Sequence, residues 1–70
     1  MSWDNTQFIS FGEDVFIDSY AIIRRPYLCR IGNHVAIDNA TISTALDIGD
    51  YVHISPYVSI IGGENGLLQM

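Results

Sequence analysis

The sequence predicts an all-β domain in which the chain winds as a parallel β-helix of about three coils. Three segments share one template, and they span residues 11–23, 31–43 and 48–60. In each of them a large apolar residue recurs at every sixth position, and a small or β-branched residue stands four places after it. A period of six fits neither a helix of about 3.6 residues per turn nor an alternating strand, but it fits a short strand followed by a tight corner. Three such hexads make one triangular coil of about eighteen residues, and successive coils stack as parallel strands.

The expected interior consists of two sets of side chains that turn inward together. The large apolar members are Phe11, Ile17, Ile31, Ile37, Ile48 and Ile54. The small or β-branched members are Val15, Ala21, Val35, Thr41, Val52 and Val58. The residue that closes a hexad should point outward, so we expect Phe16, Ile22 and Ile42 on the surface, where they can supply subunit contacts.

A glycine follows the first apolar residue of each segment, at Gly12, Gly32 and Gly49. We expect these glycines at a corner, where freedom of the backbone angles is useful. The first positions of the three segments are 20 and then 17 residues apart. The difference falls on the third side of each coil, residues 23–30 and 43–47, as a stacked repeat predicts because variation is confined to loops.

The repeat region, residues 11–70, is expected to form the single domain of the chain, and residues 1–10 precede the repeat. This leading segment carries Trp3 and Phe8, and we expect it to cap the first coil, because an open end exposes strand edges and apolar core.

At the other end, residues 60–70 are expected to form the third side of coil three. They contain a glycine-rich turn at 62–66, which lacks the lysine and the strand-to-helix context of a phosphate-binding loop. The chain stops where a fourth coil would begin, so we expect either a longer parent protein or burial of the exposed end by other subunits.

Composition narrows the classes of partner. The net charge is −5 with three basic side chains, which offers no footprint for nucleic acid or an anionic membrane. The single cysteine excludes an intrachain disulfide, and neither a basic signal-peptide start nor a long apolar run is present. We therefore expect a cytoplasmic protein.

Residues 48–63, Ile-Gly-Asp-Tyr-Val-His-Ile-Ser-Pro-Tyr-Val-Ser-Ile-Ile-Gly-Gly, resemble the bacterial hexapeptide-repeat transferases. Within that family they look most like the sugar O- and N-acetyltransferases of surface-polysaccharide synthesis, and the general repeat covers residues 11–63. The resemblance implies a left-handed coil, a homotrimer, and acetyl-CoA in the cleft between two neighbouring β-helices. It also implies a histidine that acts as general base on the hydroxyl or amine of a sugar or nucleotide-sugar acceptor, which attacks the thioester.

One branch of the family, the nucleotide-sugar N-acetyltransferases, carries His-acidic-Cys-x-Ile-Gly and a second histidine four residues after the glycine. His53 matches the second histidine, whereas Thr44 stands at the position of the first. His53 is therefore the candidate base, on the outward face in column with Phe16 and Ala36. The alternative interpretation is a surface or interface histidine without chemistry.

The other histidine, His34, falls in column with Asp14 and Tyr51. We expect it to have a solvated or hydrogen-bonded surface role. The same scaffold hosts a zinc carbonic anhydrase, but a catalytic zinc site needs three protein ligands and the chain has two histidines on different columns, so no metal is expected.

Three further interpretations concern the remaining polar residues and the chain as a whole. Asp18 and Asp38 are expected to bond the local backbone at corners. The pair Arg24–Arg25 could reach phosphates, but a solvated loop pair is favoured. The function predicted is an acetyltransferase-like protein, or a truncated or inactive version of one, and the alternative is a non-catalytic structural or trimerising module. A small antiparallel β domain would not explain the equal spacing of the hexads.

Overall fold

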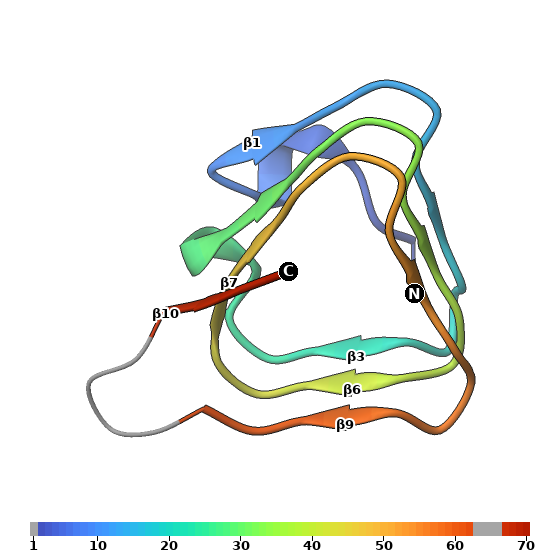
Figure 1. Ribbon diagram of the computed structural model, residues 1–70, viewed down its shortest axis with the longest axis vertical. Coiled ribbons are helices and arrows are strands. Elements are labelled where there is room, and N and C mark those ends of the chain that lie inside the picture. The colour runs from blue at the N-terminus through green and yellow to red at the C-terminus, as the bar shows by residue number, and fades with distance from the viewer. Residues whose placement is uncertain (1, 63–66) are drawn as a thin grey trace.

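The structure is a computed structural model that describes residues 2–62 and 67–70. Three parallel sheets form the walls of a triangular tube (Figure 1). Within the described ranges the only helical segments are two short 3-10 turns, η1 (Asn5–Gln7) and η2 (Pro26–Leu28). None of the helices in those ranges has the length and apolar character needed to cross a bilayer. The predicted all-β class is confirmed.

Each wall receives one strand from each of the three coils, and wall A receives a fourth strand near the end of the chain. Wall A consists of β1 (Ser10–Phe11), β4 (Cys29–Ile31), β7 (Ala45–Ile48) and β10 (Leu67–Gln69). Wall B consists of β2 (Phe16–Ile17), β5 (Ala36–Ile37) and β8 (His53–Ile54). Wall C consists of β3 (Ile22–Ile23), β6 (Thr41–Ile42) and β9 (Ser59–Ile60). All pairings are parallel, so the strands of one wall lie one coil apart.

The predicted common interior is confirmed for Ile31, Ile37, Ile48 and Ile54. Their side chains belong to one apolar core and are between 0% and 3% exposed. Ile31 pairs with Ile48 on wall A, and Ile37 pairs with Ile54 on wall B. The spacing of six therefore brings aliphatic side chains from successive coils into direct stacks, which removes them from water.

Wall C differs from the expectation by one residue. In this wall Thr41 pairs with Ile22, whereas Ile42 pairs with Ile23 and is 1% exposed. The expectations that Thr41 turns inward and Ile42 outward were wrong, and Ala40 takes the inward place. The second hexad of coil two is one residue short, so the inward position falls one residue earlier in the sequence than a count of six predicts.

The other two outward predictions are confirmed. Phe16 on wall B is 54% exposed and Ile22 on wall C is 49% exposed. Both are large apolar side chains in strands of the first coil, β2 and β3. They therefore lie at the same level of the tube on adjoining walls.

The glycine column has a different cause from the one expected. None of these glycines has a positive φ. A Cβ on Gly12 would stand 2.4 Å from the carbonyl oxygen of Gly32, and a Cβ on Gly32 would stand 2.7 Å from that of Gly49. The column is glycine because the backbones of successive coils approach too closely to admit a side chain.

The left-handed backbone conformation falls two residues after each glycine. Asp14, His34 and Tyr51 have φ values of 55°, 57° and 59°. The backbone N–H of His34 donates to the carbonyl of Glu13 at 2.9 Å, so the turn is tied to the coil before it. Asp and His tolerate this region better than most residues, and at Tyr51 the equivalent bond to Asn33, also 2.9 Å, holds the turn.

The N-terminal segment packs against the first coil. Phe8 is buried, Trp3 packs against the core, and the ring centroids of Phe8 lie 5.9 Å from Trp3 and 5.2 Å from Phe11. The Asp4 side chain caps η1 by accepting from the Thr6 backbone N–H at 2.9 Å. These contacts cover the core at that end of the tube.

The third sides carry the differences in coil length. Residues 24–28 form the insertion of coil one and contain η2, and Arg24 and Arg25 are exposed there. The short side of coil two passes directly into β7. Residues 60–70 were expected to form the third side of coil three, but β10 pairs with β7 and adds a fourth strand to wall A. Residues 63–66 of the predicted glycine-rich turn lie outside the described residues.

Candidate functional site

His53 lies on the outward face of wall B. It pairs with Ala36, which pairs with Phe16, so the predicted column is confirmed. The next residue, Ile54, turns into the core, and the alternation of a strand therefore directs His53 outward. Its side chain is 60% exposed. A dissolved molecule can thus reach the imidazole from solvent.

Asp38 binds this imidazole. The Oδ2 atom of Asp38 lies 2.7 Å from Nε2 of His53, and the carboxylate is about two-thirds shielded from solvent. Asp38 directly follows Ile37, the partner of Ile54, so it leaves wall B diagonally opposite His53. Its backbone N–H donates to the Ile54 carbonyl at 2.9 Å, which fixes the carboxylate beside the ring.

The two aspartates interpreted as corner residues have different roles. Asp18 bonds the local backbone as predicted, because its Oδ1 accepts from the Tyr20 N–H at 2.7 Å. For Asp38 the bond found is the one to His53 instead. Sequence reasoning missed this pair, although aligning the second and third segments places His53 opposite Ala36, two residues before Asp38.

The contact with Asp38 determines which nitrogen of the His53 ring carries the proton and which keeps its lone pair. A carboxylate accepts, so Nε2 carries the proton that it donates to Asp38, and Nδ1 keeps the lone pair. This tautomer is assigned from the hydrogen bond. The same hydrogen bond holds the ring in one orientation. The pair therefore provides an exposed imidazole that is held by a carboxylate.

His34 has the hydrogen-bonded surface role that was predicted. Its Nδ1 lies 2.9 Å from Oδ2 of Asp14, and its ring stacks on Tyr51 with centroids 4.8 Å apart. These residues come from three successive coils at the corner between walls A and B. The structure therefore does not bring His34 and His53 into one site.

Thr44, which stands where one branch of the resembled transferases carries its first histidine, is buried with 6% exposure. It lies between β6 and β7, where the chain passes from wall C to wall A. Gly62 packs against it so closely that a Cβ there would stand 2.1 Å from the Thr44 hydroxyl. Thr44 and the exposed His53 on wall B therefore do not form a shared catalytic surface.

Within residues 2–62 and 67–70, no three His, Cys, Asp or Glu side chains gather to hold a metal ion. Each histidine instead lies beside one aspartate. The part of the chain that the structure describes thus contains nothing resembling a three-ligand zinc centre.

Cys29 is the single cysteine and is 1% exposed. Burial raises the pKa of its thiol, and the opposing effect of a backbone hydrogen bond with Leu46 is smaller. Because the thiolate is the reactive form, we expect the native chain at pH 8 to react with Ellman's reagent at least about 100-fold more slowly than the chain in guanidinium. Equal rates in the two states would contradict the packing of Cys29 in wall A.

Comparison of the chain with protein-family models, curated proteins and solved structures finds no match. A function for this chain therefore has to be inferred from its residues and their geometry. The feature with the clearest chemical meaning is the pair formed by His53 and Asp38.

Proposed function

We propose that this chain is a left-handed parallel β-helix that transfers an acetyl group from acetyl-CoA to the hydroxyl or amine of a sugar, with His53 as general base. The observation that supports this most directly is the exposed imidazole whose Nε2 lies 2.7 Å from the Asp38 carboxylate. The hexapeptide spacing and the parallel walls fit the scaffold on which the resembled transferases work. The left hand of the coil comes from that resemblance and departs from the right-handed rule for parallel crossovers.

The residues around His53 suit this chemistry. Acetyl-CoA supplies the activated acetyl thioester. Nδ1 of His53 accepts the proton of the acceptor hydroxyl or amine while that group attacks the thioester carbonyl carbon. As the carbon–sulfur bond breaks, the imidazolium returns the proton to the departing sulfur. Asp38 stabilises the imidazolium between these two steps.

The wall around the base favours a cleft between subunits. Phe16 and Ala36 continue the outward column of His53 and present an apolar strip beside the imidazole. In a homotrimer a neighbouring chain would cover this strip and leave the acceptor and the cofactor between two tubes. Exclusion of water from such a cleft strengthens the interaction between Asp38 and a protonated His53.

A second function is favoured by one observation, the burial of Thr44. Threonine fills the position of the family's first histidine and lies in a packed turn. A chain that keeps the scaffold without that histidine can serve as a trimerising module with no catalysis. Light scattering combined with titration of acetyl-CoA separates the two: affinity for acetyl-CoA supports the enzyme, a trimer without affinity supports the module, and a monomer without affinity contradicts both.

Replacement of His53 by alanine tests the base directly. We expect acetyl transfer to a sugar acceptor to fall by a factor of about 100 or more, because the acceptor proton then has no positioned base. The matched control is His34→Ala, which removes the other histidine from its own aspartate and should leave turnover near the wild-type rate. Unchanged turnover in the His53→Ala variant would end the candidacy of His53.

A further inference from the structure

We propose that the hollow beside Trp3 binds a small neutral aromatic molecule whose carbonyl oxygen accepts a hydrogen bond from the indole Nε1–H of Trp3. The hollow lies against β3 of wall C, in the first coil, whereas His53 lies on β8 of wall B, in the third coil. The hollow is therefore separate from the candidate base, and its ligand is independent of the proposed acetyl transfer.

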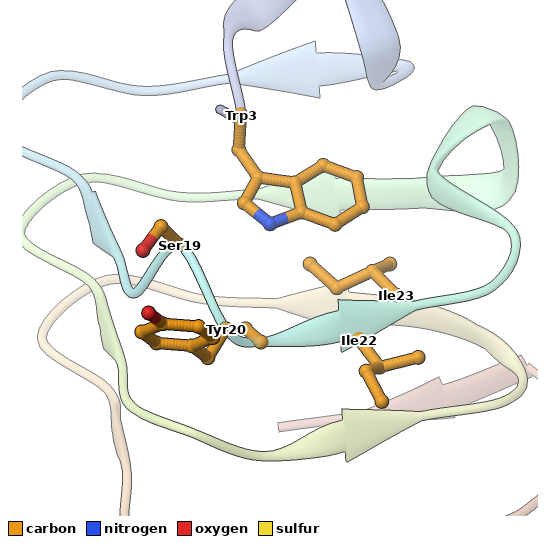
Figure 2. A pocket seen from close by; sticks show the side chains of 6 residues that line it. Trp3, Ser19, Tyr20, Ile22 and Ile23 are labelled. Carbon is orange, nitrogen blue, oxygen red and sulfur yellow. The ribbon is translucent and has the colours of Figure 1, made fainter. Parts of the chain in front are cut away.

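The hollow has a volume of about 380 Å³ and is open to solvent on one side (Figure 2). Its lining residues are Trp3, Ser19, Tyr20, Ala21, Ile22 and Ile23. Ala21 and Ile23 are buried and form the floor, whereas Tyr20 and Ile22 are 79% and 49% exposed and lie at the rim. A concave, mainly apolar site with few polar groups is the usual form of a small-molecule site.

The charges in and around the hollow favour a neutral ligand. None of the described side chains that line it is charged. The carboxylate of Asp18, close by in the chain, already accepts from the Tyr20 N–H at 2.7 Å. An ionised ligand would lose its water on this apolar floor without gaining an opposite charge. The net charge of −5 also disfavours an anion.

The shape of the lining favours an aromatic ring. Trp3 lies on one side of the hollow and Tyr20 on the other, so two aromatic side chains flank the space (Figure 2). A flat ring can stack on one of them or meet its edge, and both arrangements are favourable beyond the area that they bury. The aliphatic side chains of Ile22 and Ile23 complete the contact.

The indole nitrogen of Trp3 indicates what the ligand carries besides its ring. Nε1 is shielded from water and has no hydrogen-bond partner among residues 2–62 and 67–70. Buried polar groups in native proteins are nearly always paired, and an indole N–H can only donate. The missing partner is therefore an acceptor.

The hollow is the side from which this acceptor can arrive. In Figure 2 the edge of the indole that carries the nitrogen is turned toward Ser19 and Ile23, which both line the hollow. Contact with this shielded atom requires the rim to widen, and exposed side chains such as Tyr20 change rotamer readily. A carbonyl oxygen projects beyond its ring and is slim enough to reach a recessed donor.

The indole N–H itself reports on the proposed hydrogen bond. Trp3 is the one tryptophan of the chain, so a ¹H–¹⁵N NMR spectrum contains a single indole signal. Acetophenone should move this proton downfield, because its ketone accepts from Nε1. Ethylbenzene has nearly the same shape without the acceptor and should cause a smaller displacement. An indole signal that stays in place with acetophenone, or moves equally with both probes, would overturn the proposal.

Trp3→Phe removes the donor and keeps an aromatic wall. Titration followed on the methyl signals of Ala21 and Ile23 should show that acetophenone binds about tenfold more weakly to this variant, the usual effect of losing one hydrogen bond. The affinity for ethylbenzene should change by less than about twofold, since it makes no such bond. Equal losses for the two probes would mean that the N–H contributes nothing and that the assigned acceptor is wrong.

A second pair of variants tests the location without touching Trp3. Ile22→Ser removes apolar contact at the rim, so both probes should bind at least about threefold more weakly. Ile9→Ser is the matched control, because Ile9 has the same exposed fraction, 49%, and does not line the hollow. Circular dichroism should be unchanged in both variants. Equal affinities in Ile22→Ser and Ile9→Ser would place the probes elsewhere and refute the site.

Discussion

Replacing Ile37 with aspartate should abolish folding of the chain. Ile37 is fully buried on wall B, between Ile17 of the coil before and Ile54 of the coil after. The change removes a packed aliphatic side chain, which alone costs about 2–5 kcal/mol, and leaves an unpaired carboxylate in the core, which costs several more. A domain of this size has roughly 5 kcal/mol or less of net stability to lose.

The measurement is far-ultraviolet circular dichroism with thermal unfolding, and a matched control lies one residue away. Ala36→Asp changes the same strand at a position that faces outward between Phe16 and His53. That variant should keep a cooperative transition. Val35, 1% exposed, should behave like Ile37 when it is replaced by aspartate. A folded Ile37→Asp chain with a normal transition would mean that Ile37 does not face the core.

Walls A and B could be predicted from the sequence because the period alone decides which side chains meet. Ile31 and Ile48, and likewise Ile37 and Ile54, keep the same distance from the glycine of their segment. No residue is gained or lost between the glycine and these isoleucines, so the count of six reaches the buried position in each coil. The regular spacing therefore carried enough information to place both walls.

The inward residues of wall C were harder to predict because the segment that leads into β6 is one residue shorter than the equivalent segments of the other two coils. Counting six from Val35 reaches Thr41, although the inward residue is Ala40. A local signal was present, since each strand of this wall follows the order small residue, variable residue, isoleucine. These triplets are Ala21-Ile22-Ile23, Ala40-Thr41-Ile42 and Val58-Ser59-Ile60. Packing preserves the triplet and absorbs the missing residue in the corner before it.

For the candidate site, the sequence predicted the position of His53 but not its partner. The outward direction of His53 follows from its place before an inward isoleucine. The bond to Asp38 depends on a diagonal contact between two coils, and this contact exists only once the stacking distance and the end of β5 are fixed. The repeat predicts which residues share a column, but a contact between residues of different columns depends on how the coils stack. The pair of His53 and Asp38 was therefore found only in the structure.

The glycine column leads to a prediction that separates two physical causes. Gly32→Ala should destabilise the chain by about 1–3 kcal/mol, the usual cost of forcing extra volume into packed structure. The new Cβ would stand 2.7 Å from the carbonyl carbon and oxygen of Gly49, and backbone atoms of a stacked coil cannot move aside singly. Chemical denaturation of both proteins measures the difference.

Gly49→Ala is the matched control, because the nearest atom to its Cβ is the Met70 carbonyl oxygen at 3.2 Å. Alanine also loses less conformational entropy than glycine on folding, a gain of about 0.4–1 kcal/mol where the backbone angles permit it. The two effects oppose each other at Gly49, so we expect a change near zero there. If freedom of the backbone were the reason for the column, both substitutions would cost the same; a large loss confined to Gly32 identifies contact between coils as the cause.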